Sequence, residues 1–272
     1  MKIPLLYCGN ARVFDGMVIS LLSVTKNCKQ PLDVWLLTMD LQDVDPAYRP
    51  IREDHRIYLE EICRAVNPES SVTLRDATAL YRETLLGAPN EQNSYTPYMF
   101  LRLYADRIPG MPSRLIYLDT DTVAAGDLSE LYEQNLRGAE YGAVRDYYGR
   151  WFFGPNYINS GVLLLDLDRI RETGLFRKAL DLCAGKKLFL PDQKALNRMV
   201  KKKRILPRRF NEQHKLKKDT VIRHFSMTIH WIPFYTKSVK PWDVDAVHRE
   251  LNLHAFDDVL NDYLSRKPGF PE

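Results

Sequence analysis

Apolar runs alternate with amphipathic segments along most of this 272-residue chain. Short apolar runs that end in turn residues predict buried strands. They occupy residues 3–8, 32–39, 72–74, 114–123, 157–167 and 221–225. Apolar positions at helical spacing predict helices. These cover residues 17–24, 48–66, 98–108, 127–135, 175–183, 192–203 and, as one or two helices, 243–266. Strands that alternate with helices predict an α/β fold whose sheet is covered on both faces.

One predicted strand ends in acidic residues. Asp119 and Asp121 follow the apolar run Leu115–Leu118, and side chains two apart on a strand point the same way. Two converging carboxylates repel each other unless a cation lies between them. Ligands of α/β proteins also bind at the carboxyl ends of strands. The pattern therefore favours a divalent metal that holds a diphosphate, with an ordinary polar turn as the alternative.

Composition narrows the class of protein. With 45% hydrophobic and 11% aromatic residues, the chain is globular and not disordered. The net charge of +4 suits an anionic substrate but does not predict nucleic-acid binding. The four cysteines lack metal-site spacing, so we expect reduced thiols. No apolar run reaches the ~18 residues of a membrane span, and the first residues are typical of a strand and not of a signal peptide. These features predict a soluble, cytoplasmic protein.

Residues Lys201 to Arg204 form a run of four basic residues in a chain whose net charge is otherwise close to neutral. The simpler interpretation is a solvated helix end with favourable dipole placement. The alternative is contact with anionic lipid at the inner face of a membrane, or with a polyanionic acceptor.

Six ordered motifs resemble family 8 of the retaining glycosyltransferases, which includes bacterial lipopolysaccharide galactosyl- and glucosyltransferases and glycogenin. YLDTDTVAAGDLSELY resembles the family's D-x-D signature. The other matching segments, in chain order, are IPLLYCGNARVFDGMVISLLSVTKN, YTPYMFLRLYADRIP, YINSGVLLLDLDRIR, LPDQKALN, and VIRHF followed by VKPWD. The resemblance implies a nucleotide-diphospho-sugar transferase fold of the GT-A type, with a mixed, mostly parallel sheet. We expect residues 1–242 to form the catalytic domain and residues 243–272 a helical extension packed on it.

The resemblance also implies a role for individual residues. The metal ligands would be Asp119, Asp121 and His224, a set that suits Mn²⁺, with Mg²⁺ as the alternative. The donor-binding residues would be Tyr7, Cys8, Asn10, Arg102, Asp119, Thr120 and Lys240. The residues nearest the transferred sugar would be Asn159, Asp192 and Gln193. The chain departs from the family at Gly9-Asn10, where many members carry paired acids. Asn10 is then the residue expected to contact the uracil or the ribose, and the preference for uracil depends on it.

The implied reaction is transfer of galactose or glucose from a UDP-hexose to a carbohydrate or glycolipid acceptor, with retention of configuration. No carboxylate base for the acceptor is evident in the sequence, so the leaving phosphate would take the acceptor proton. One rival is a sugar-nucleotidyltransferase, but the chain lacks the G-x-G-x-R loop of those enzymes. Another is a non-catalytic protein that binds a nucleotide sugar, which is disfavoured because all three metal ligands are present.

The segment between the last two motifs is longer than in most family members. Residues 225–239 carry Trp231, Phe234 and Tyr235, and aromatic side chains on a loop must be buried or leave an exposed patch. We expect this segment to fold over the donor as part of the acceptor wall, with residues 151–153 opposite. The alternative places Trp231 and Phe234 in the core beside the C-terminal helices.

Overall fold

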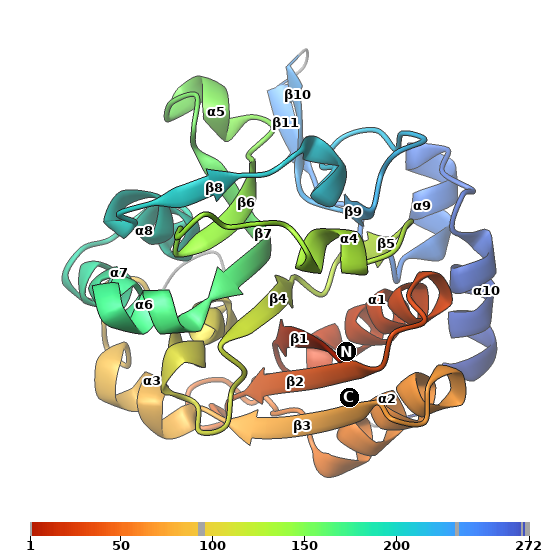
Figure 1. Cartoon of the computed structure of the whole chain (residues 1–272), viewed down its shortest axis with the longest axis horizontal. Helices are drawn as coiled ribbons and strands as arrows, with labels where there is room; N and C mark the ends of the chain where they lie inside the picture. The colour runs from red at the N-terminus through yellow and green to blue at the C-terminus, as the bar shows by residue number, and fades with distance from the viewer. Residues whose placement is uncertain (1, 92–95, 232–233, 268, 270–272) are drawn as a thin grey trace.

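A seven-stranded sheet forms the centre of the protein (Figure 1). The computed structural model describes residues 2–91, 96–231, 234–267 and 269. The sheet order is β3-β2-β1-β4-β7-β6-β8. Its strands are β1 Ile3–Cys8, β2 Leu32–Thr38, β3 Ser71–Asp76, β4 Arg114–Leu118, β6 Tyr141–Arg145, β7 Ile158–Asp166 and β8 Lys203–Ile205. Only the pairings of β7, with β4 and with β6, are antiparallel within this sheet. The predicted mixed, mostly parallel sheet is confirmed.

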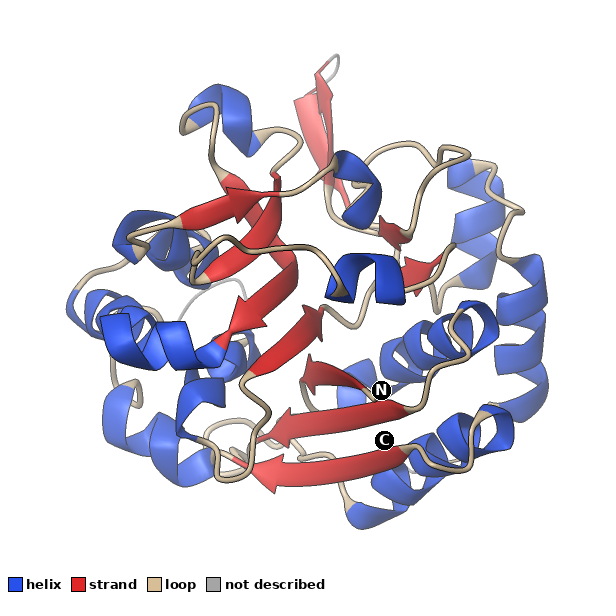
Figure 2. Cartoon of the chain, viewed as in Figure 1, coloured by secondary structure: helices blue, strands red, loops and turns tan. Residues whose placement is uncertain are grey.

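Helices cover both faces of the sheet, as Figure 2 shows. Successive side chains of a strand point to opposite faces; Leu5 and Leu6 of β1 accordingly lie in two different core clusters. The first cluster includes side chains of α1 Phe14–Asn27, α2 Glu53–Val66, α9 Val244–Leu251 and α10 Asp257–Arg266. The second includes those of α3 Thr78–Thr84, the 3-10 helix η2 Pro97–Arg107, α6 Leu167–Thr173, α7 Leu175–Gly185 and α8 Pro191–Met199. The apolar runs are therefore buried on two sides, which is why they read as continuous and not alternating.

Shorter elements lie around this core. They are the 3-10 helices η1 Ala11–Val13 and η3 Arg208–Phe210, and the short helices α4 Ser129–Tyr132 and α5 Gly149–Phe152. Strand β5 Thr122–Ala124 pairs with β9 Ile222–His224, and β10 Thr228–Trp231 forms a hairpin with β11 Phe234–Lys237. None of the helices described is both long enough and apolar enough to cross a bilayer.

Three element predictions are corrected. The strand expected over 114–123 is two strands, because the chain turns at Asp119 and β5 joins a second sheet. The helix expected over 48–66 begins at Glu53, beyond Pro50, whose ring disfavours helix at the preceding residue. The helix expected over 192–203 ends at Met199. The basic run 201–204 therefore lies in a turn and in β8, an edge strand, where lysines are common because they discourage further pairing.

The two C-terminal helices share the core of the sheet. Val247 of α9 and Leu260 and Tyr263 of α10 are buried in the same cluster as α1, and α10 lies beside α1 in Figure 1. Helices α9 and α10 therefore share one core cluster with α1. The division into two units at residue 242 stays a prediction.

The sheet's topology gathers several chain segments at one edge. Strands β1, β4 and β6 point the same way, so their carboxyl ends share this edge. Because β7 runs against them, its amino end, with Asn159 and Gly161, lies there as well. Asp119 follows β4 directly, and its backbone N–H donates to the Gly161 carbonyl over 2.7 Å. This is the edge at which ligands of α/β sheets bind.

Candidate active site

Asp119, Asp121 and His224 come together at this edge. Each offers one ligand atom, and these atoms all lie within 4.8 Å of one another. His224 Nε2 is 3.1 Å from Asp121 Oδ1 and 3.8 Å from Asp119 Oδ2. Two carboxylates and an imidazole form a donor set that suits Mn²⁺, with Mg²⁺ as the harder alternative. The residues present therefore fit a divalent cation.

The β5–β9 pair brings His224 to the two acids. Thr122 and His224 are register partners in this pair, and the Phe225 N–H donates to the Asp121 carbonyl over 2.9 Å. His224 Nδ1 is 3.1 Å from Asn211 Oδ1. An amide oxygen only accepts, so Nδ1 carries the proton and Nε2 is free to bind a metal. Asn211 thus orients the imidazole toward the acids.

Gly161 leaves the room that this grouping needs. A Cβ at this position would lie 2.2 Å from His224 Cε1 and 2.7 Å from Asp119 Oδ2. Both distances are far below van der Waals contact, so a larger residue would displace the candidate ligands. A glycine within a strand is often the sign of such a close approach.

Two cations balance the acids. Lys240 Nζ is 2.5 Å from Asp121 Oδ2. Burial alone would raise the pKa of Asp121, but Lys240 and His224 outweigh it and lower that pKa. The position of Lys240 follows from Trp242 two residues later, whose ring packs against Gly16 of α1 so closely that a Cβ there would lie 2.6 Å from it. Lys240 is therefore held where it could reach a phosphate that replaced the Asp121 contact.

Arg102 is the second cation, and it is buried. It donates to Asp119 Oδ1 over 2.9 Å and to the Ser160 carbonyl over 2.6 Å, and its Nε lies 3.5 Å from Asp192 Oδ2. Its guanidinium also lies over the Tyr117 ring, 4.2 Å from the centroid. Arg102 therefore ties the end of β4 to β7 and α8.

We expect Arg102→Lys to lower the free energy of unfolding by about 1.5–3 kcal/mol, because an ammonium cannot reproduce the fork that bonds several partners at once. Mn²⁺ affinity should fall as well, since Asp119 loses its orientation. Urea unfolding and calorimetric Mn²⁺ titration measure the two effects. The matched control is Arg107→Lys on the same 3-10 helix, where the side chain is exposed. Equal effects of the two substitutions would contradict this role of Arg102.

The residues predicted near the transferred sugar belong to one buried polar network. Gln193 Oε1 accepts from the Ser160 N–H over 3.0 Å, and Asn159 Oδ1 accepts from the Gly161 N–H over 3.0 Å. Asp146 Oδ2 accepts from the amides of both Asn159 (3.0 Å) and Gln193 (3.2 Å). Such a network fixes the orientation of its members.

Two further contacts extend this network. Asn211 donates to Asn159 Oδ1 over 2.9 Å and also contacts His224. It therefore joins the network to the candidate metal group, which is Asp119, Asp121 and His224. Asp192 is buried beside Arg102 and accepts from the Ser160 hydroxyl over 3.3 Å; burial raises its pKa. A carboxylate so enclosed has its orientation fixed before any hydroxyl binds.

The residues predicted for the nucleotide lie at the end of β1. Tyr7 is buried and its hydroxyl lies 2.9 Å from Ser20 Oγ. Burial raises the pKa of the Cys8 thiol; the charge of Arg102 opposes this rise and that of Asp119 adds to it. Asn10 is buried, and its Nδ2 has no hydrogen-bond partner in the described part of the chain. Thr120, between the two acids, is half-buried. All four therefore lie at the same sheet edge as the acids.

The predicted acceptor segment is a hairpin that starts four residues after His224. The side chains of Trp231 and Phe234 lie outside the described part of the structure, so the choice between acceptor wall and core stays open for them. Tyr235 is exposed. The hairpin does meet the region of α5: the Ile229 N–H donates to the Tyr148 hydroxyl over 3.2 Å. Trp151 and Phe152 of α5 are 77% and 59% exposed, so this part of the surface carries apolar side chains.

Asn211, Asp146 and Gly161 were not predicted from the sequence. Asp146 directly follows an apolar strand, the same signal that identified Asp119, but β6 itself contains Gly142 and was not recognised. Gly161 interrupts the apolar run of β7, and this was a usable signal of close approach. Asn211 lies in an irregular segment and offers no such signal.

A profile of glycosyl transferase family 8 matches residues 4–246. One relative, a lipopolysaccharide 1,2-glucosyltransferase of Escherichia coli K12, is 31% identical over 180 residues, which are 57% of this chain and 52% of the relative. Another Escherichia coli lipopolysaccharide 1,2-glucosyltransferase is 26% identical over 84% of this chain and 69% of its own length. The chain thus spans about half of the first relative and two thirds of the second.

Solved structures show the same fold. An active-site mutant of LgtC superposes with a TM-score of 0.69 at 16% identity, over 100% of this chain and 98% of LgtC. The glycosyltransferase GlyE of Streptococcus pneumoniae gives 0.63 at 20% identity, over 100% and 66% of the two chains. The predicted GT-A fold is confirmed by these neighbours. Because the family profile covers nearly the whole sequence, the chain belongs to glycosyl transferase family 8.

Proposed function

We propose that this protein is a retaining hexosyltransferase that uses a UDP-hexose, with galactose or glucose as the sugar, and a divalent cation, Mn²⁺ or Mg²⁺. The acceptor is a carbohydrate or a glycolipid. One observation carries the proposal: in a family 8 chain, Asp119, Asp121 and His224 converge with Lys240 at the ligand-binding edge of the sheet. Asn10, Tyr7, Cys8 and Thr120 would form the part of that edge nearest the nucleotide.

Each proposed role follows from chemistry at this edge. When bound, the cation would neutralise negative charge that develops on the leaving diphosphate. Lys240 would donate to a diphosphate oxygen in place of Asp121, as a point charge on a flexible stem allows. Asp192 would accept a hydrogen bond from a sugar hydroxyl, while Asn159 and Gln193, held by Asp146, flank the reacting carbon. The leaving phosphate would accept the acceptor's proton.

The relatives indicate where such an activity would operate. Several are lipopolysaccharide glucosyl- or galactosyltransferases. We infer by analogy a role in the synthesis of a cell-envelope polysaccharide, in the cytoplasm, with the exposed Lys201 and Lys202 of the basic run 201–204 available to the inner face of the membrane.

A donor-hydrolysis screen tests the proposal. With Mn²⁺ present, UDP-glucose or UDP-galactose should be hydrolysed faster than GDP- or TDP-hexoses, and excess chelator should stop the reaction. The nucleotide that is released also tests the alternative of a sugar-nucleotidyltransferase, because such an enzyme would form UTP when it runs in reverse with pyrophosphate. UTP formation, or hydrolysis unaffected by chelator, would contradict the proposal.

Retention can be read from the first-formed transfer product. NMR of that product should show an α-linkage from an α-configured donor. A β-linkage would show inversion and would contradict this part of the proposal.

A further inference from the structure

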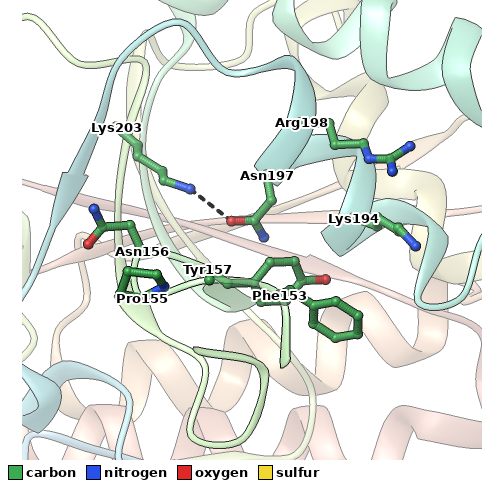
Figure 3. Close-up of a pocket in the computed structure, with 9 residues that line it drawn as sticks. Phe153, Pro155, Asn156, Tyr157, Lys194, Asn197, Arg198 and Lys203 are labelled. Atoms are coloured by element: carbon green, nitrogen blue, oxygen red, sulfur yellow. Dashed lines mark hydrogen bonds between the residues drawn. The ribbon is translucent and has the colours of Figure 1, made fainter. Parts of the chain in front are cut away.

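A cavity of about 440 Å³ lies beside the polar network, between α8, the start of β8 and the segment before β7. Figure 3 shows its lining: Lys203 on one side, Lys194 and Arg198 on the other, and Phe153 and Tyr157 below. The volume falls within the range of small-molecule sites, about 300–1,000 Å³. Three of its lining residues are cationic, so its chemistry differs from that of the acidic metal group.

The positive charge of this cavity is not compensated. No ion pair to Lys194, Arg198 or Lys203 is found across the described ranges of the chain. Lys203 Nζ donates to the neutral Asn197 Oδ1 over 2.9 Å, and burial lowers the pKa of this ammonium. Lys194 Nζ lies 5.7 Å from the centroid of the Phe153 ring. A bound anion would supply the missing negative charge.

The cavity shares its framework with the proposed sugar site. Lys194 follows Gln193 on α8, and Asn197 accepts from the Ile158 N–H and donates to the Ile158 and Gln193 carbonyls at 2.9–3.0 Å. Burial raises the pKa of Tyr157 to about 12, and a hydrogen bond with the Gln193 side chain opposes that rise. Tyr157 therefore borders both the cavity and Gln193. A ligand in the cavity would lie next to the proposed sugar site.

We propose that this cavity binds a phosphoryl group carried by the acceptor, so that the acceptor is a phosphorylated carbohydrate. The inference rests on the proposed function, because it treats the neighbouring network as the sugar site. The Arg198 fork can bond two phosphate oxygens at once, and two lysines add point charges. Phe153, which is 47% exposed, offers an aromatic side chain to the sugar that bears the phosphate. Under the proposed function, the candidate metal group binds the cation that holds the donor diphosphate. The phosphoryl group of the acceptor therefore needs a separate site.

Direct binding tests the proposal without donor, metal or turnover. Glucose 6-phosphate is the probe, glucose the uncharged comparison, and ligand-observed NMR or calorimetry the measurement. The phosphate should bind at least about tenfold more tightly than glucose, and Lys203→Gln should weaken its binding by about tenfold. Lys203→Arg should keep most of the affinity because it keeps the charge. The matched control is Lys201→Gln, which removes an equal charge two residues away, outside the cavity lining.

Three outcomes would overturn the proposal. One is equal affinity for glucose and its phosphate. The second is equal weakening by Lys203→Gln and Lys201→Gln, which would show a general surface effect. The third is sedimentation with vesicles of phosphatidylglycerol in phosphatidylcholine, lost in Lys203→Gln, without any binding of glucose 6-phosphate; that result would assign the phosphoryl group to lipid and not to a sugar. The binding experiments contain no UDP-hexose. If UDP-hexose hydrolysis failed, that result would reject the proposed function and would leave the binding results valid.

Discussion

The Asp121→Asn variant is expected to turn over about 10²–10³-fold more slowly than the wild type in the presence of metal. A reduction of this size is typical when one stabilising contact to a charged transition state is removed. Asp121 contacts both His224 and Lys240. An asparagine removes one formal charge from the candidate metal group and leaves Lys240 without its anionic partner. Weaker Mn²⁺ binding should accompany the lower rate, and calorimetry with UDP-glucose hydrolysis measures both.

The control for this experiment is Asp245→Asn, which removes the same charge from an exposed position at the start of α9. It should leave hydrolysis and Mn²⁺ affinity at their wild-type values. Melting temperatures of both variants separate a lost ligand from a lost fold. Wild-type Mn²⁺ dependence in a folded Asp121→Asn protein would show that the metal is held elsewhere.

Gly161→Ala should reduce turnover by about 10²-fold or more, since displacement of a catalytic group by about 1 Å has an effect of that size. The added methyl would occupy the space of His224 Cε1 and press on Asp119 Oδ2. Both neighbours are held by other bonds, His224 by Asn211 and Asp119 by Arg102, so neither can move freely. A loss of about 1–3 kcal/mol of stability is expected as well, because the added methyl would overpack the space around Gly161.

Gly185→Ala is the matched substitution. Nothing lies within 4 Å of a Cβ at that position, and it ends α7, so stability and activity should hardly change. UDP-glucose hydrolysis and thermal unfolding of the two variants give the comparison. If Gly161→Ala kept wild-type Mn²⁺ affinity, the close packing of β7 against the candidate ligands would not matter for the metal site.

The strands were predictable where both faces of the sheet are covered. Ile3–Cys8 and Ile158–Asp166 read as unbroken apolar runs because each side chain meets one of two cores. The acidic end of β4 was predictable for a related reason: polar side chains after a buried strand lie at its exposed end. The assignment of His224 and Lys240 needed the resemblance, since nothing in their immediate sequence distinguishes them from other histidines and lysines.

The two strands of the central sheet that were not predicted, β6 and β8, lie side by side at one end of the strand order. Tyr141–Arg145 contains glycine and alanine, so its apolar signal is low. Lys203–Ile205 is a polar edge strand whose pairing with β6 depends on tertiary structure. The supporting residues were missed for the same reason. Asn211 matters because it bonds Asn159, 52 positions earlier in the chain, and His224, and such a relation leaves no periodic trace in the sequence.

All seven strands of the central sheet come from residues 3–205, whereas His224 and Lys240 follow later. During synthesis from the amino terminus, the sheet can therefore assemble before the candidate metal site is complete. If the candidate site binds a cation, its imidazole ligand would arrive only when β9 pairs with β5, so the complete site would form after the sheet. High-affinity Mn²⁺ binding would then report a finished chain: a nascent polypeptide that stops short of residue 222 would have every strand of the sheet but only the two carboxylates of the site.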